Sequence, residues 1–195
     1  MLAIEQKILK YLEKYVSLTE DEKLTIIQVL PYQTFEKGTH LLRQGAVSKE
    51  CFFNVQGLVR QYQTIDGEEK TTDFYTEGDA IVAFDSAAKK TPSNFSWVCE
   101  EETTLVIGRL DKIDDVYAQH PKLEKMSALF INQEFGRYQN LSSIWITLNP
   151  EQRYLHVLEK RPDLVNRVPQ YHLASFLGIK PETLSRIRKR ISERK

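Results

Sequence analysis

The sequence predicts a mixed α+β protein in which a β-roll or jelly roll precedes a long helix and a C-terminal helix-turn-helix. Between Phe35 and Arg109, short runs rich in β-branched and aromatic residues alternate with glycines. An apolar pattern of helical period starts at Pro121, and a glycine separates two short helical patterns near the C-terminus. The chain is therefore divided into residues 1–120, a β-roll domain with N-terminal helices, residues 121–148, the long helix, and residues 149–195, the helix-turn-helix domain.

The composition favours a globular protein that contacts a polyanion at one end. The chain has 195 residues with 27 basic and 27 acidic side chains, yet residues 150–195 hold 11 of the basic and only 5 of the acidic ones. The alternative is a solvated basic helix face. The two cysteines, Cys51 and Cys99, cannot form a disulfide framework. With no signal peptide and no apolar stretch of membrane length, the expected location is the cytoplasm.

The N-terminal segment is predicted to form two helices. Apolar residues recur at helical spacing over residues 2–16. Thr19 and Glu22 form a capping-box pattern, in which each side chain can bond to the other residue's backbone N–H. A second helix is expected over residues 20–30, and Pro31 should stop it.

Glycines at positions 38, 45, 57, 67 and 78 interrupt the segment that follows. The Asp66-Gly67 pair indicates a hairpin turn, because both residues tolerate positive φ. Short strands are expected over His40–Arg43, Cys51–Val55, Leu58–Thr64, Lys70–Tyr75, Ser96–Cys99 and Thr103–Ile107.

Helical patterns return after the strands. Asp111 is a candidate N-cap for a short helix to about Gln119, and Pro121 suits the first turn of the long helix. The long helix has two apolar stripes, although a helix packed on one side needs only one. We expect one stripe to pack on the β-roll and the other on a second copy of the chain, the alternative being burial of both in one subunit. The stripe assigned to the dimer interface contains Ala128, Ile131, Phe135, Tyr138 and Trp145, and the other contains Leu123, Met126, Phe130, Leu141, Ile144 and Leu148, interrupted by Glu134 and Arg137.

The C-terminal segment carries the most specific pattern. Gly178 can end a short helix in the left-handed conformation, and a tight glycine turn between two helices is typical of a helix-turn-helix. The expected elements are a helix over Glu151–Lys160 capped by Asn149, a loop over Arg161–Pro169, a helix over Gln170–Leu177 and a last helix from Pro181 to about Ser192. Its small core should contain Leu173, Ala174, Leu177, Ile179, Leu184 and Ile187.

The last helix exposes polar residues that suit DNA. Glu182 and Arg186 lie four positions apart and therefore share a face. In the major groove, the carboxylate can accept from a cytosine amino group, and the guanidinium can donate to a guanine edge. The alternative is an ordinary ion pair on a solvated helix. Candidate phosphate contacts are Thr183, Arg188, Lys189, Arg190 and Arg194.

These features resemble the Crp/Fnr superfamily of bacterial transcription regulators, which join a cyclic-nucleotide-binding-type β-roll to a long dimerisation helix and a helix-turn-helix. Residues 178–186, GIKPETLSR, resemble the family's G-hydrophobic-x-x-E-T-hydrophobic-S-R signature. The resemblance implies that Glu182, Ser185 and Arg186 contact bases of TGA-containing half-sites. Pro181 departs from members that carry a third base-contacting side chain at its position. The turns that match family landmarks are Gly38, Gln44-Gly45, Gln56-Gly57, Asp66-Gly67 and Glu77-Gly78-Asp79.

The region that would hold an effector departs further from the family. Members that bind cyclic AMP hold its phosphate in a segment that opens with Gly-Glu and closes with Arg-Ser/Thr-Ala. Here the opening is Gly78-Asp79, and Asn94 stands in place of the arginine. A phosphate without that guanidinium loses a bidentate, charge-assisted contact, so tight cyclic AMP binding is not expected. Lys89 and Lys90 are expected on a flexible tip nearby. The candidate effector pocket contains Gly78, Asp79, Asn94, Phe95 and Ser96.

The sequence gives little indication of a metal cluster, a redox-sensing thiol or a catalytic site. An iron–sulfur cluster needs about four cysteines, and this chain has two. We expect Cys51 and Cys99 to be buried structural thiols and not redox sensors. The absence of a nucleophile–base pattern argues against an enzyme, and no metal or cofactor is expected. The histidines are scattered over His40, His120, His156 and His172.

The sequence therefore indicates a homodimeric transcription regulator that binds double-stranded DNA at an inverted repeat. Further expected partners are an unknown small-molecule effector and RNA polymerase, and no membrane is expected. Two alternatives stay open: a small-molecule-binding module whose C-terminal domain contacts protein, and a jelly-roll metalloenzyme.

Overall fold

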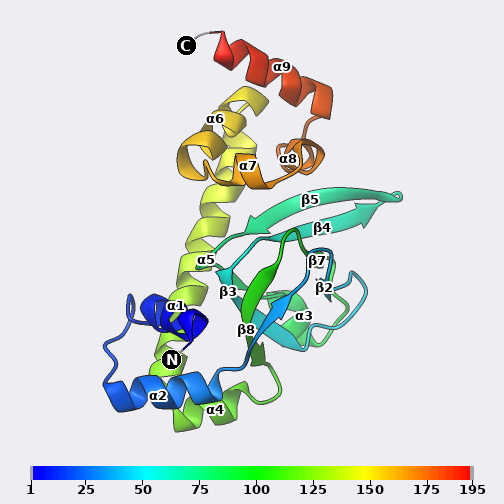
Figure 1. The fold of residues 1–195 in the computed structure, drawn as a ribbon. Coiled ribbons are helices and arrows are strands. Elements are labelled where there is room, and N and C mark those ends of the chain that lie inside the picture. Colours follow the sequence, from blue (N-terminus) through cyan, green and yellow to red (C-terminus); the bar gives the residue numbers. More distant parts are fainter. Residues whose placement is uncertain (1, 194–195) are drawn as a thin grey trace. The chain divides into compact units, whose positions relative to one another are not determined.

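The structure, a computed structural model, describes residues 2–193 and has two compact units. Unit 1 comprises residues 1–61 and 74–136, and unit 2 comprises residues 62–73 and 137–195. The predicted α+β class is confirmed: antiparallel sheets, one long helix and a set of C-terminal helices follow one another along the chain (Figure 1).

Two four-stranded sheets form the β-roll. One has the order β1-β8-β3-β6 and the other β2-β7-β4-β5. All six predicted strands are present with boundaries within two residues of the prediction, and two short strands, β1 and β6, were missed. β1 has only four residues, and its pairing with β8 comes from a segment about 70 positions later in the chain. The strands are β1 Tyr32–Phe35, β2 His40–Leu42, β3 Glu50–Gln56, β4 Val59–Ile65, β5 Glu68–Tyr75, β6 Ala80–Ile81, β7 Ser96–Cys99 and β8 Thr103–Arg109.

The core of the roll lies between the two sheets. Trp97 of β7 is fully buried there, with its ring edge-on to Phe52 of β3. Val59, Tyr75 and Leu105 bring β4, β5 and β8 into the same cluster. The Asp66-Gly67 turn between β4 and β5 has φ values of 53° and 79°, which confirms the predicted hairpin.

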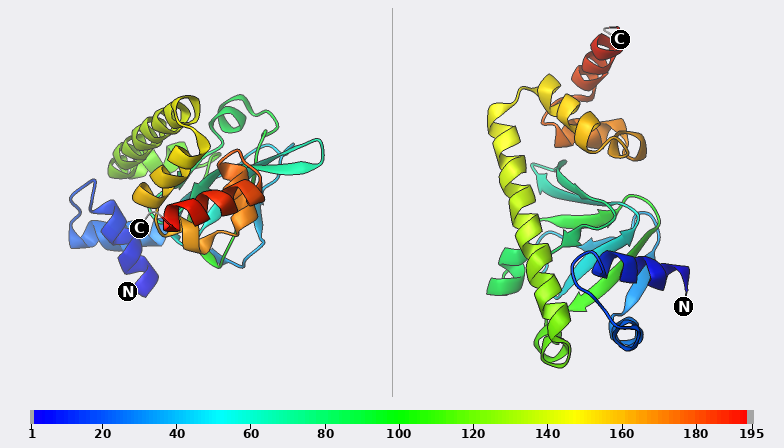
Figure 2. Two further views of the ribbon diagram at one scale, coloured as in Figure 1. Left: turned by 90° about the horizontal axis from the view of Figure 1, so that it is seen from above. Right: turned by 90° about the vertical axis from the view of Figure 1, so that its left-hand side faces the viewer.

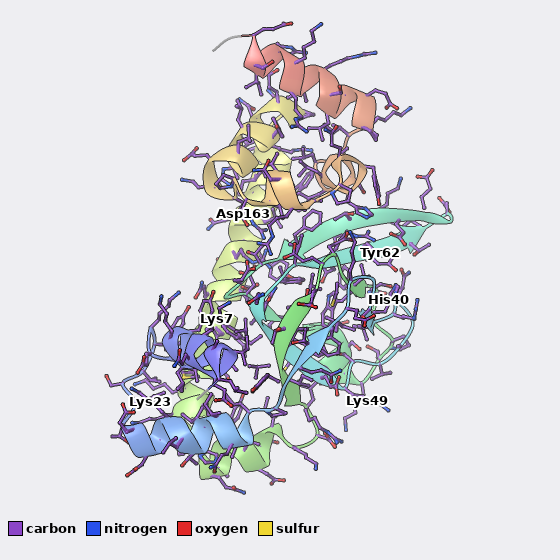
Figure 3. The ribbon with its side chains drawn as sticks, in the orientation of Figure 1. Lys7, Lys23, His40, Lys49, Tyr62 and Asp163 are labelled. Atoms are coloured by element: carbon purple, nitrogen blue, oxygen red, sulfur yellow. The ribbon has the colours of Figure 1, made fainter. Side chains whose placement is uncertain are left out.

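The two N-terminal helices, α1 (Ala3–Leu12) and α2 (Glu20–Val29), form a second core in unit 1 with the outer side of the roll. The predicted capping box is present, with Thr19 Oγ1 accepting from the Glu22 N–H at 3.3 Å. Lys7 of α1 and Lys23 of α2 are labelled in Figure 3. Lys7 donates to Gln56 at the end of β3, and Lys23 pairs with Glu13. The buried apolar residues of this core are Ile8, Leu9, Leu12, Ile26, Val55, Val106, Leu123 and Met126.

Two short helices differ from the sequence predictions. Helix α3 (Phe84–Lys89) was missed, because its N-cap, Ala83, has no side chain that can cap. Lys89 therefore ends a helix instead of lying on a flexible tip, and Lys90 follows it in the left-handed conformation. Helix α4 (Ile113–Gln119) begins two residues after Asp111, so the predicted N-cap was wrong. The Asp111 carboxylate instead forms an ion pair with Arg109 at 2.8 Å.

The long helix α5 (Pro121–Thr147) has the two predicted apolar stripes. One packs on unit 1 as expected: Leu123 and Met126 are buried, and Phe130 packs against Tyr15 and Phe53. Charged side chains are usually exposed, but the two that interrupt this stripe are not fully exposed to solvent. Glu134 is buried, and Arg137 is bound by Asp73 of β5, with Nη1 donating to Oδ1 at 3.0 Å.

Four helices follow α5 in unit 2: α6 (Pro150–Lys160), α7 (Leu164–Arg167), α8 (Gln170–Phe176) and α9 (Pro181–Ser192) (Figure 2). The predicted cap of α6 is confirmed, since Asn149 Oδ1 accepts from the Gln152 N–H at 3.0 Å. The predicted loop before the helix-turn-helix was wrong in part, because it contains α7. This single helical turn is stabilised by burial of Leu164, and its N-cap residue, Asp163, makes no capping hydrogen bond with its side chain.

Candidate DNA interface and sensor site

The turn between α8 and α9 has the geometry that the sequence predicted. Gly178 adopts a φ of +69°. Its N–H donates to the Ser175 carbonyl, and the Ile179 N–H donates to the Ala174 carbonyl, both at 3.0 Å. These bonds satisfy carbonyls at the end of α8, as in other glycine-terminated helices. The buried residues that hold α8 against α9 are Leu173, Ala174, Leu177, Leu184 and Ile187, while Ile179 is half-buried.

The outer face of α9 presents the predicted base-contacting residues to solvent. Glu182, Ser185 and Arg186 are all exposed, on the side of the helix away from Leu184 and Ile187. Within residues 2–193, Glu182 and Arg186 form no ion pair with each other or with another side chain. The alternative of an i,i+4 ion pair is therefore not realised, and both groups are available to a ligand.

The predicted phosphate-contacting residues fall into two groups. Thr183 is exposed and Arg188 is half-buried, and neither has a side-chain partner among the described residues. Arg190, by contrast, pairs with Glu151 of α6 at 2.7 Å, and Lys189 lies 3.9 Å from Glu193. Arg194 lies outside the described residues.

The residues predicted to form the dimer interface differ in their exposure to solvent. Ala128, Ile131 and Phe135 are exposed, with 45% of Ile131 and 64% of Phe135 accessible. Tyr138 is half-buried. Trp145 packs within its own chain, edge-on to Phe176 with ring centroids 5.8 Å apart. The sequence analysis missed Ile146, which is 81% exposed one position later and is the most accessible large apolar side chain of α5.

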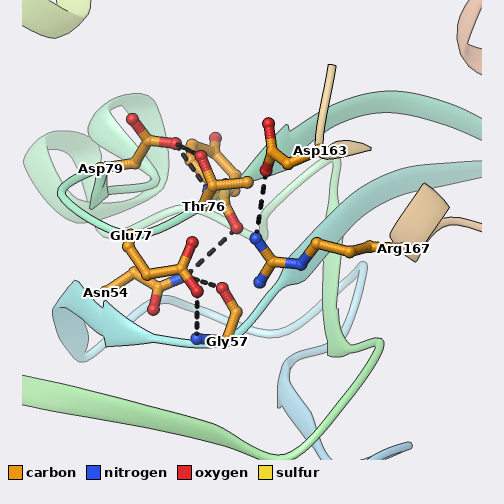
Figure 4. Close-up of polar contacts among 8 residues, drawn as sticks. Asn54, Gly57, Thr76, Glu77, Asp79, Asp163 and Arg167 are labelled. Atoms are coloured by element: carbon orange, nitrogen blue, oxygen red, sulfur yellow. Dashed lines mark hydrogen bonds and ion pairs between the residues drawn. The ribbon is translucent and has the colours of Figure 1, made fainter. Parts of the chain in front are cut away.

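Several hydrogen bonds hold the Gly78-Asp79 turn within unit 1, and Figure 4 shows those that join Asp79 to Thr76 and Glu77 to Gly57. The Gly78 N–H donates to the Asn54 carbonyl at 2.8 Å, and the Asp79 carboxylate accepts from the Thr76 N–H at 2.7 Å. Glu77 accepts from the Gly57 N–H at 2.9 Å. Burial and the nearby charges of Glu77 and Asp79 raise the pKa of Tyr11. A Cβ added at Gly78 would lie 3.2 Å from the Tyr11 ring. These contacts give the turn a structural role.

The other predicted effector residues have a different set of partners. Asn94 is exposed to solvent. The Phe95 N–H donates to Ser93 Oγ at 3.0 Å, and Ser96 Oγ accepts from the Gln44 N–H at 2.9 Å. Residues 94–96 thus bond to one another's neighbours and to the loop after β2. The Gly78-Asp79 turn bonds to β3 and to the residues that follow β5. The two parts of the predicted effector pocket therefore have separate hydrogen-bond partners.

A buried polar network inside the roll was missed by sequence reasoning. Gln61 Oε1 accepts from the Tyr75 hydroxyl at 3.0 Å and from Trp97 Nε1 at 2.9 Å. Next to Gln61 in sequence, Arg60 donates through Nε to Glu100 at 2.5 Å, and both side chains are almost fully buried. Buried polar groups need such partners. An arginine and a glutamine within a strand pattern were the only sequence signal of this network.

The thiols are poorly suited to redox sensing. Burial raises the pKa of Cys99 to about 11, and burial also raises the pKa of Cys51. Both are therefore protonated at neutral pH, whereas the reactive species is the thiolate. Among residues 2–193, no three histidine, cysteine or acidic side chains gather closely enough to hold a metal ion. No helix in this part of the chain is both long and apolar enough to span a membrane.

Comparison with known proteins gives one family match and several structures of similar fold. Residues 32–120 match the family model of the cyclic nucleotide-binding domain. A search of curated proteins returned no match. Among solved structures, FixK2 from Bradyrhizobium japonicum is similar with a TM-score of 0.70 at 14% identity, covering 85% of this chain and 86% of that chain.

Two further solved structures are similar in fold to this chain. The c-di-GMP responsive global regulator CLP of Xanthomonas campestris has a TM-score of 0.68 at 15% identity, covering 96% of this chain and 91% of that chain. TTHA1359, a transcriptional regulator of the CRP/FNR family from Thermus thermophilus, has a TM-score of 0.67 at 14% identity, covering 84% and 87%. Residues 32–120 are therefore similar in sequence to a cyclic nucleotide-binding domain. The chain shares its fold with these three proteins, one of which is described as a transcriptional regulator of the CRP/FNR family, so the fold that the sequence resemblance implied is confirmed.

Proposed function

We propose that this protein is a cytoplasmic, homodimeric transcription regulator that binds an inverted repeat in double-stranded DNA through α9. The carrying observation is the unpaired, exposed set of Glu182, Ser185 and Arg186 on a helix that is held in place by the Gly178 turn. A carboxylate and a guanidinium that have no partner among the described residues retain their full capacity to bond with base edges. The predominance of basic residues in this part of the chain supplies the attraction to phosphate.

Selection from a pool of random duplexes tests this function directly. The enriched sequences should contain an inverted repeat whose half-site centres are about 34 Å apart, one turn of DNA, because a dimer presents two copies of α9. Affinity should fall steeply with salt. Enrichment of no sequence, together with weak binding that does not depend on salt, would favour the alternative in which the C-terminal unit contacts a protein.

Cyclic AMP should not bind tightly to the β-roll of this protein. Asn94 is exposed and uncharged where cyclic AMP-binding members have an arginine, so the phosphate would lack a charge-assisted partner there. Titration calorimetry with cyclic AMP should therefore show no sub-micromolar binding. Sub-micromolar binding would show that another cation holds the phosphate, with Lys89 and Lys90 at the end of α3 as the first residues to replace.

A further inference from the structure

The end of α5, the start of α6 and the turn of the helix-turn-helix meet at a single side chain in unit 2, Arg153 of α6. Its Nε donates to the Leu148 carbonyl at 3.0 Å, and its Nη2 donates to the Trp145 carbonyl at 2.9 Å. Its Nη1 donates to the Leu177 carbonyl at 3.2 Å. One guanidinium thus bonds to the C-terminal ends of two helices, α5 and α8.

These three carbonyls are groups that helices leave unsatisfied. The last four carbonyls of an α-helix have no partner within the helix, and its C-terminal end carries partial negative charge. Trp145 and Leu148 lie at the end of α5, and Leu177 is the residue that caps α8. A cation that bonds to both ends at once satisfies the carbonyls and is attracted to both helix dipoles.

Trp145 packs at the same junction between α5, α6 and α8. The Arg153 guanidinium lies over its ring, 4.4 Å from the centroid, and Phe176 of α8 meets the ring edge-on. The α-carbon of Gly178 faces the ring as well, since an added Cβ would lie 3.2 Å from it. The turn that leads into α9 is therefore packed directly on the last turns of α5.

We infer that Arg153 is a positioning residue that fixes the direction of α9 relative to the end of α5. The inference rests on the proposed function, because in a dimer joined through α5 this direction sets the separation of the two recognition helices. In this proposal each half-site is recognised by α9 alone. The preferred spacing between half-sites depends on how the Arg153 contacts orient α9 relative to the end of α5. Arg153 should therefore control the preference for half-site spacing without contacting DNA.

The test compares wild-type protein with Arg153→Lys, which keeps the charge but cannot reach three carbonyls, and with Arg153→Met. The control is Lys160→Met, which removes an exposed positive charge from the same helix. Binding is measured to the selected inverted repeat, to repeats with one or two base pairs inserted between half-sites, and to a duplex with a single half-site. Each inserted pair moves the half-sites apart by about 3.4 Å.

Both Arg153 variants should lose about tenfold in affinity for the native spacing, the scale of a typical coupling free energy between sites. Their affinity for the single half-site should be unchanged, and the penalty for inserted pairs should shrink. In a Trp97→Phe background, the emission of Trp145 should also shift in the Arg153 variants but not in the Lys160 control.

Two results would overturn the inference. If Arg153→Lys keeps the wild-type spacing preference, the contacts of the Arg153 guanidinium do not determine that preference. A parallel loss on the single half-site and on every repeat would show that Arg153 only stabilises the fold. If the wild-type protein itself shows no preference for an inverted repeat, the proposed function has failed instead.

Discussion

Replacing Arg186 with alanine should cost about 1–3 kcal/mol of binding free energy per half-site at the base it reads, and should relax the preference for that base. The guanidinium is exposed on α9 and has no ion-pair partner among residues 2–193, so its removal leaves no buried charge behind and should not affect folding. A competition assay between the selected site and its single-base variants measures both effects. Arg186→Lys should restore charge but not base preference, because only the guanidinium offers a bidentate fork.

Two matched variants separate base reading from general attraction. Arg43→Ala removes an exposed guanidinium from the β-roll and should change neither affinity nor preference. Arg188→Ala should weaken binding to all sequences alike and lower the salt slope by about 1 if Arg188 contacts phosphate. Retention of the wild-type base preference in Arg186→Ala would remove α9 as the reading element.

Charged residues at Ile131 and Phe135 should convert the proposed dimer into monomers. Both side chains are exposed in the single chain, on the face of α5 that does not pack on unit 1. Burying a carboxylate in an apolar interface without a partner is costly. The double variant Ile131→Glu, Phe135→Glu should therefore sediment as a monomer. Its affinity for the inverted repeat should fall about a hundredfold or more, because the second half-site is no longer bound by the same molecule.

The control for this experiment is Leu24→Glu, which places a carboxylate at an exposed leucine of α2 and should leave the mass unchanged. Ile146→Glu asks whether the interface extends to the last turn of α5, where the most exposed apolar side chain of that helix lies. A dimer mass for the Ile131, Phe135 double variant would place the interface elsewhere on the chain.

Local signals were enough to predict much of the fold and the outer face of α9. The caps at Thr19 and Asn149, the hairpin at Asp66-Gly67 and the left-handed Gly178 all depend on residues within a few positions of one another. Helical period alone also determines that Glu182 and Arg186 lie opposite Leu184 and Ile187. Such features follow from the sequence because the chain cannot rearrange them without breaking local hydrogen bonds.

Tertiary structure alone decided which polar and aromatic residues have partners within the chain. Arg137 binds Asp73, which lies 64 positions away, and Arg190 binds Glu151, which lies 39 positions away. Trp145 belongs to the apolar stripe by its spacing, yet it packs against Phe176, and the exposed large apolar residue at that turn is Ile146. A periodic pattern gives the direction in which a side chain points on its own helix. The segment that meets it there depends on how distant parts of the chain pack.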